Sequence, residues 1–407
     1  MAAAASLNPF RTLAVHRNFR VFWAGQTTSQ VGTWMQSVAQ GWLALELSND
    51  AFMVGVVSAA GSLPVLLLSL LAGVLADRVD KLRLVTVAQS LMLVQAVALW
   101  WFTWSGHVTI GWLVTLAAAG GVLQAVEVPA RQSLVIELVG REDLLDAIAL
   151  NSTGFNLARI VGPSLAALVI GQLGLAWCFG MNALSYMAVL AGLLSIRLPA
   201  MVAEPSASSP LEGLREGLRF VRGAPEISTL LGLTAVYSVF GLPYLTLMPV
   251  FARDVLGLGA SGYGALLSFV GVGAITGALS LAAVGRRVRR GRLLPVTSLG
   301  FAALLVVLSF VRSPQAAAGV LLLAGLTMIL TNAITNGLLQ TLSPDAFRGR
   351  VMSVYSLLFI GFSPAGALTA GAVARSFGVA VAIGGSAVVM LAYGGWTFWR
   401  RREIREL

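Results

Sequence analysis

Long stretches without a charged residue dominate this chain, and short charged turns separate them. A helix needs about 20 mostly apolar residues to cross roughly 30 Å of hydrocarbon. Dividing the uncharged stretches at their turns predicts twelve membrane-spanning helices, and the chain is therefore expected to be an all-α integral membrane protein. The spans are placed at about 21–45, 51–75, 84–104, 108–129, 145–170, 174–196, 227–252, 260–284, 293–311, 316–340, 350–373 and 378–399.

A single long polar interruption, residues 197–226, separates six spans from six. The expected organisation is an N-terminal six-helix half (1–196), a cytoplasmic linker with a short amphipathic helix (197–226), and a C-terminal six-helix half with a basic cytoplasmic tail (227–407). The two halves show weak internal sequence similarity, since Gly162-Pro163 in span five is matched by Ser363-Pro364 in span eleven. Paired halves are typical of secondary transporters, whose substrate site lies near the midplane between them.

Composition excludes several classes of protein. Hydrophobic residues make up 57% of the 407 residues and charged residues 11%, against about 45–50% and about 25% in soluble domains, which excludes a large soluble enzyme. The lone Cys178 excludes a cysteine metal site, two histidines exclude a histidine cluster, and no Ser or Thr follows Lys81 as a P-loop requires. We therefore expect neither enzymatic activity, nor a metal, nor a cofactor.

The basic residues predict the orientation in the membrane. The formal net charge is +10, which favours either nucleic acid or a membrane surface as a partner. If the N-terminus is cytoplasmic, every Lys and Arg except Arg159, Arg253, Arg312 and Arg375 falls in a cytoplasmic segment. This asymmetry follows the positive-inside rule. The expected partner is thus the lipid bilayer and not nucleic acid, and both termini are expected to be cytoplasmic.

Several motifs resemble one family. Residues 73–83, GVLADRVDKLR, resemble the loop between helices two and three of the major facilitator superfamily, although Asp80 stands where glycine is usual. The segments NFRVFW (18–23), GTWMQ (32–36), PARQ (129–132) and NLARIVGP (156–163) resemble the branch of enterobactin exporters and macrolide efflux pumps.

The resemblance implies a twelve-helix transporter with two pseudo-symmetric six-helix halves, monomeric and in the inner membrane of a bacterium. It would export small amphiphilic molecules such as siderophores, macrolides or other drugs, by alternating access and in exchange for protons. Two alternatives stay open: a lipid or lysophospholipid flippase of the same fold, and a membrane sensor or scaffold that transports nothing.

Polar residues within the spans are the candidates for the substrate site, because a lipid-facing polar residue is costly. Span one carries a polar stripe at alternating spacings of four and three residues, and it is either a cavity wall or a set of interhelical hydrogen bonds. Amides and phenols at helical spacing in spans seven and ten suit an amphiphilic ligand. The stripe comprises Gln26, Gln30, Thr33, Ser37 and Gln40, and the other candidates are Tyr237, Tyr244, Asn332 and Asn336.

Arg159 lies near the middle of span five, on one face with Asn156. A charge at this depth needs a partner or water, and a guanidinium suits anionic oxygen groups. The two hypotheses are a substrate site for an anion and an internal ion pair that holds the first half together.

Other residues are candidates for the gate and for proton coupling. The resemblance assigns gating to Gly73, Asp77 and Arg78 and to the Gly162-Pro163 bend, and Arg131 is the basic partner expected for Asp77. Coupling needs a carboxyl group that binds and releases a proton near the cavity. We assign it to Glu127, with Asp146 in reserve; the alternative is a static salt bridge between Glu127 and Arg131 at i+4.

Overall fold

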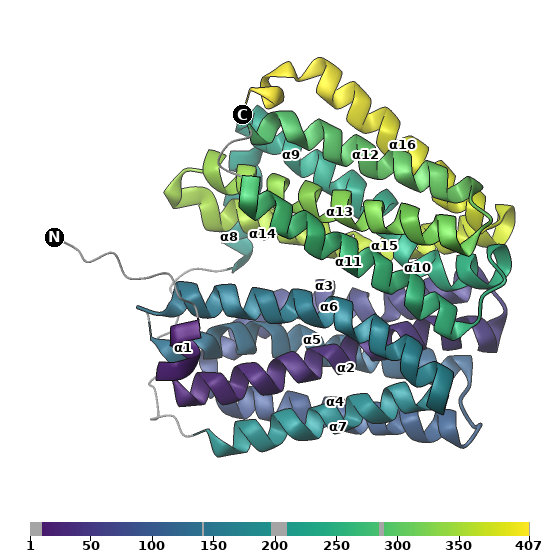
Figure 1. The fold of residues 1–407 in the computed structure, drawn as a ribbon. Coiled ribbons are helices and arrows are strands. Elements are labelled where there is room, and N and C mark those ends of the chain that lie inside the picture. The colour runs from purple at the N-terminus through teal and green to yellow at the C-terminus, as the bar shows by residue number, and fades with distance from the viewer. Residues whose placement is uncertain (1–9, 141, 197–209, 285–288, 407) are drawn as a thin grey trace. The chain divides into compact units, whose positions relative to one another are not determined.

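The computed structural model describes residues 10–140, 142–196, 210–284 and 289–406. All regular structure in these ranges is helical (Figure 1). Eleven helical segments of the described chain are long and apolar enough to cross a membrane. Helix α2 (Arg17–Ser48) supplies the twelfth span, although its many amide and hydroxyl side chains make it less apolar than the others. The predicted all-α, twelve-span fold is therefore confirmed.

The helices follow the predicted order. Before the linker they are α1 (Phe10–Val15), α2, α3 (Ala51–Arg78), α4 (Lys81–Trp104), α5 (Ile110–Val139), α6 (Leu144–Leu173) and α7 (Ala176–Ser195). The linker contains α8 (Pro210–Gly223). After it come α9 (Pro225–Val236), η1 (Tyr237–Gly241), α10 (Pro243–Val250), η2 (Phe251–Val255), α11 (Ala260–Val284), α12 (Arg290–Phe310), α13 (Pro314–Leu342), α14 (Asp345–Gly361), α15 (Ser363–Phe377), α16 (Val379–Arg400) and η3 (Arg402–Arg405).

Prolines within the spans act in different ways. Helix α5 continues through Pro129 to Val139, so the fourth span extends ten residues beyond the predicted boundary at 129. Pro163 also lies inside one continuous helix, α6. Its counterpart Pro364 instead lies in the first turn of α15, directly after the break that separates α14 from α15. A proline is tolerated in a first turn because no helical N–H is lost there.

The seventh span departs from regular α-helical geometry at two places. Segments η1 and η2 are π-helical turns, and the amide of Leu242 donates to the carbonyl of Tyr237, five residues earlier, at 3.1 Å. A π-turn accommodates one extra residue, and such turns occur frequently at functional sites.

The two halves repeat the same construction. The third span α4 packs along the sixth, α7, and the ninth span α12 packs along the twelfth, α16 (Figure 1). The fifth span ends at Gly174 with φ 91° and ψ 165°, and the eleventh ends at Gly378 with φ 88° and ψ 154°. Glycine suits both ends, because a side chain rarely adopts a positive φ. These equivalent pairings and turns support the internal repeat expected from the sequence.

The chain forms two compact units that do not follow the chain order completely. The first unit comprises Met1–Ala39, Leu67–Val108 and Ala119–Ala207, and the second comprises Gln40–Leu66, Thr109–Ala118 and Ser208–Leu407. The expected division into 1–196 and 227–407 stays a prediction. Within the second unit, the start of α3 packs directly on α15: a Cβ at Gly55 would lie 2.5 Å from the carbonyl oxygen of Ala367.

Candidate functional site

The polar stripe of α2 is divided between helix packing and an accessible face. Gln26 is buried and accepts a hydrogen bond from the amide of Gln89 on α4, at 3.3 Å. Thr33 lies 3.2 Å from the hydroxyl of Tyr186 on α7, whereas Ser37 is exposed and donates to the carbonyl of Thr33. Part of the predicted cavity wall therefore consists of interhelical hydrogen bonds.

Two buried atoms of the stripe lack a hydrogen-bond partner among the described residues. They are Oε1 of Gln30 in the first unit and Nε2 of Gln40 in the second. A buried polar atom without a partner costs about 1–3 kcal/mol. These two predicted substrate residues therefore present the free polar atoms that a ligand or water would satisfy.

A second face of α2 carries a polar network that the stripe does not include. Gln36 is buried, donates to Gln95 on α4 at 3.3 Å and accepts from Asn182 on α7 at 2.8 Å. Ser185 donates in turn to Asn182 Oδ1 at 3.1 Å. Sequence spacing alone missed this network because Gln36 falls between the stripe positions, although an amide in each of three spans is a signal for it.

In the first unit, Arg159 lies beside two aromatic rings, those of Trp34 on α2 and Phe155 on α6, and we call this group the corner at Arg159. Its guanidinium carbon lies 5.9 Å from the ring centre of Trp34, and that ring meets Phe155 edge-on at 5.9 Å. Phe155 is exposed, and so is Asn156, whose amide donates to the carbonyl of Ser152 at 2.8 Å. A cation beside exposed aromatic rings suits an aromatic anion. Both Arg159 and Asn156 lie in α6, and their role in binding substrate stays a prediction.

Glu127 is buried among polar groups of three helices. Its side chain is 5% exposed, and Oε1 lies 2.9 Å from Arg131 Nε, an ion pair without the alignment of a hydrogen bond. The amide of Gln89 donates to the same Oε1 at 3.1 Å and is shared with Gln26. The Oε1 of Gln89 is buried and has no hydrogen-bond partner within the described chain. The buried carboxylate of Glu127 is thus held within the first unit by the guanidinium of Arg131 and the side-chain amide of Gln89.

The position of Asp146, the alternative candidate for proton coupling, is explained by the helix whose first turn contains it. It lies half-buried in the first turn of α6, where a carboxylate interacts favourably with the helix dipole. Nearby, Asp143 at the N-cap of α6 lies 2.7 Å from His16 Nε2, which fastens the start of α2 to α6.

The gating residues are placed only in part. Gly73 lies in α3, with no neighbouring side chain where a Cβ would stand. The side chains of Asp77 and Arg78 lie outside the described residues. Arg131 pairs with Glu127, so its expected role as the partner of Asp77 stays a prediction.

Gly162 has a clear structural role. A Cβ there would lie 2.5 Å from Trp34 Cβ and 2.9 Å from the Val31 carbonyl oxygen. Gly162 is therefore the point at which α6 approaches the backbone of α2, with Pro163 beside it in the same helix.

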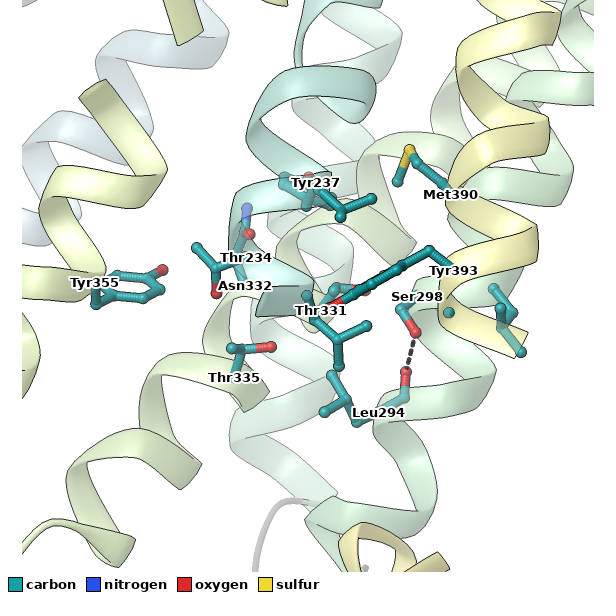
Figure 2. Close-up of a pocket in the computed structure, with 14 residues that line it drawn as sticks. Thr234, Tyr237, Leu294, Ser298, Thr331, Asn332, Thr335, Tyr355, Met390 and Tyr393 are labelled. Carbon is teal, nitrogen blue, oxygen red and sulfur yellow. Dashed lines mark hydrogen bonds between the residues drawn. The ribbon is translucent and has the colours of Figure 1, made fainter. Parts of the chain in front are cut away.

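A pocket that is partly open to solvent lies within the second unit (Figure 2). Two predicted substrate residues, Tyr237 and Asn332, line it. The other polar lining residues are Thr234, Ser298, Thr331, Thr335, Tyr355 and Tyr393.

Two further candidates lie outside the pocket lining. Tyr244 is a core residue, 2% exposed, and its hydroxyl contacts the sulfur of Met328 at 3.8 Å. Asn336 accepts a hydrogen bond from Gln340, one turn along α13. The sequence reasoning missed Tyr355 and Tyr393, yet the chain has only 6 tyrosines, and their scarcity is a signal for the pocket.

Comparison with known proteins identifies the family. The family model described as transmembrane secretion effector matches residues 4–402. The chain belongs to the transmembrane secretion effector family of the major facilitator superfamily. Members of this superfamily are membrane transporters, so this multi-pass membrane protein is a transporter of small molecules and not an enzyme.

Curated relatives of this transporter cover most of its length. It is 28% identical to the multidrug efflux pump Tap of Mycolicibacterium fortuitum over 86% of this chain and 88% of that protein. It is 27% identical to the enterobactin exporter EntS of Escherichia coli O1:K1 over 84% of this chain and 82% of that protein. The staphyloferrin A transporter of Staphylococcus aureus is 26% identical over 62% of this chain and 63% of its own length.

Solved structures show the same fold. A bacterial homolog of the human lysosomal transporter Spinster, in an inward-facing and unoccupied conformation, matches with a TM-score of 0.75 at 14% identity, over 99% of this chain and 98% of that one. A peptide transporter, POT, in complex with alafosfalin matches with a TM-score of 0.75 at 14% identity, over 98% and 99%. At this identity the likeness supports the major facilitator fold and says nothing of substrate.

Proposed function

We propose that this transporter exports small amphiphilic molecules, siderophores or drugs, in exchange for protons. The observation that carries the proposal is the buried carboxyl group of Glu127, held by Arg131 and Gln89. Burying an ionised carboxylate is costly unless it is paired and hydrogen-bonded. Protonation of Glu127 would leave Arg131 without its counter-charge, so proton binding changes the electrostatics of the first unit.

The substrate class follows from the corner at Arg159. Its guanidinium, with Trp34 and the exposed Phe155, fits an anionic group attached to an aromatic or apolar body. The named relatives include a multidrug efflux pump, a staphyloferrin A transporter and an enterobactin exporter. An exporter of amphiphilic anions and related drugs accounts for both the corner and the relatives.

Alternating access would open and close contacts at the two ends of the molecule. The close backbone packing of Gly55 on Ala367 is one contact that has to separate, and Asp50 lies 3.4 Å from Arg375 beside it. We place the protein in a bacterial inner membrane as a monomer with both termini in the cytoplasm, since the basic residues follow the positive-inside rule in that orientation.

The test is transport in proteoliposomes, with an imposed pH gradient and a panel of siderophores and macrolides. Counterflow requires substrate exchange but no net movement of protons. Glu127→Gln is expected to retain counterflow and to lose accumulation driven by the pH gradient, because the amide cannot carry the proton.

The matched control is Glu137→Gln on the same helix. Glu137 pairs with Lys81 at 2.6 Å and is also largely buried, with its side chain 13% exposed. This variant is expected to keep gradient-driven accumulation. Accumulation by Glu127→Gln at the wild-type level would refute the assignment and move it to Asp146.

A further inference from the structure

The pocket of the second unit differs chemically from the corner at Arg159. No Asp, Glu, Lys, Arg or His is among its lining residues. An ionised ligand group entering it would lose water without gaining a counter-charge, which costs several kcal/mol. The occupant therefore has to be uncharged.

The shape of the pocket depends on aromatic side chains from several helices. Tyr237 stands on the π-turn η1, with its ring 5.3 Å from Phe301 and 6.3 Å from Phe359. The ring of Tyr355 stacks on Phe359 at 5.7 Å. In Figure 2, Tyr355 turns its hydroxyl end toward the other lining residues. Rings held by such stacking offer fixed walls for a flat aromatic ligand.

The polar groups of the lining divide into two kinds. The hydroxyls of Thr234, Thr331 and Ser298 donate to carbonyls of their own helices, so their oxygen lone pairs remain as acceptors. By contrast, no hydrogen bond within the described ranges uses the side chain of Asn332 or Tyr393. The amide and the phenol are therefore available as donors.

We propose that this pocket is a binding site for an uncharged aromatic molecule of one or two rings that carries a hydroxyl or carbonyl group. The rings would lie against Tyr237 and Tyr355, and the polar group would bond Asn332 or Tyr393. The site lies entirely within the second unit, goes beyond the proposed function, and does not depend on Glu127 or Arg159.

The experiment measures saturable binding to the purified, full-length protein in nanodiscs by equilibrium dialysis. The probes are radiolabelled 2-naphthol and 2-naphthalenesulfonate, which share a ring system and differ in charge. Empty nanodiscs give the partition into lipid. Wild-type protein is expected to bind 2-naphthol saturably, and the sulfonate at least about tenfold more weakly because its charge has no partner in the pocket.

Variants locate the binding in the pocket. Thr335→Leu places a larger side chain in the lining and is expected to weaken 2-naphthol binding at least about tenfold, whereas Tyr393→Phe removes one donor and weakens it about fivefold. The matched control is Thr327→Val, two turns earlier on α13, whose hydroxyl donates to its own helix at Leu323; its binding is expected to equal that of the wild type.

The remaining measurements show whether each variant is folded and whether the binding site lies in the pocket. An unchanged unfolding midpoint in thermal circular dichroism verifies that each variant is folded. Weaker binding by folded Tyr393→Phe supports the site even if Thr335→Leu does not fold. Equal affinity of 2-naphthol and the sulfonate, unchanged binding in both variants, or no saturable binding would overturn the proposal.

Discussion

Replacing Gly162 by alanine is expected to push α6 away from α2. The added Cβ would lie 2.5 Å from Trp34 Cβ, 2.9 Å from the Val31 carbonyl oxygen and 3.2 Å from the Met35 amide nitrogen. Carbon atoms in ordinary contact are about 3.5–4.0 Å apart. None of the three atoms moves independently of the α2 backbone, so the two helices have to separate by about 1 Å.

The substitution of Gly162 by alanine has two opposed effects on the free energy of unfolding. Overpacking of this kind costs about 1–3 kcal/mol, while alanine gains about 1 kcal/mol over glycine in helix propensity. We expect a net loss of up to about 2 kcal/mol, and a loss of about 2 kcal/mol corresponds to a fall of about 4–8 °C in the unfolding midpoint of a half of this size.

Gly154 is the matched control, because it lies two turns earlier on α6 and also faces α2. Its Cβ would meet Thr27 Oγ1 at 2.6 Å and Trp23 Nε1 at 3.4 Å, which are the ends of side chains and not backbone. These atoms yield by small side-chain rotations, so the helix propensity of alanine is not outweighed. Gly154→Ala is expected to leave the midpoint unchanged or to raise it slightly.

The chain carries its own reporter for this measurement. Cys178 is the only cysteine, is buried in α7, and lies 4.0 Å from the Ala166 carbonyl on α6. A fluorogenic maleimide reacts with it only after the first half opens, so fluorescence against temperature gives the midpoint. An unchanged midpoint for Gly162→Ala, or a larger fall for Gly154→Ala, would show that the α2–α6 contact is not limiting.

Two further substitutions test named contacts. Arg159→Ala is expected to weaken binding of an anionic substrate about tenfold at an unchanged thermal midpoint; a lower midpoint at unchanged affinity would identify an internal brace instead. Asp50 caps α3 by accepting from the Phe52 amide at 2.9 Å, and it pairs with the largely exposed Arg375. Asp50→Ala should therefore cost about 1 kcal/mol and Asp50→Asn, which keeps a capping oxygen, under about 0.5 kcal/mol, as measured by thermal circular dichroism; equal losses would contradict this ranking.

The spans were predictable because bilayer thickness fixes a minimum length for each uncharged run. This argument found even α2, whose amides lower its apolar character, since the run between Arg20 and Glu46 contains no charge. It placed the end of the fourth span wrongly, because Pro129 lies inside α5 and does not end it. The π-turns of the seventh span also escaped prediction, since they depend on how the neighbouring helices pack.

The sequence indicated which polar residues to consider for the candidate site, but it did not indicate which residues on other helices they contact. Helical spacing placed Glu127 one turn before Arg131, where the structure shows their ion pair. The bond from Gln89 to Glu127 joins residues 38 positions apart. Hydrogen bonds between residues so far apart in the chain leave no local sequence pattern. The sequence therefore indicates the polar side chains but not the network that they form.

Helix α2 has a consequence for how the chain enters its membrane. Its buried Gln26 and Gln36 find their partners on α4 and α7, which are synthesised later. Until those helices arrive, the amides of α2 would face hydrocarbon without hydrogen bonds, and each unsatisfied group there costs several kcal/mol. Although α2 is synthesised before α4 and α7, it is therefore expected to reach its final place in the lipid only after the sixth span, α7, has been made.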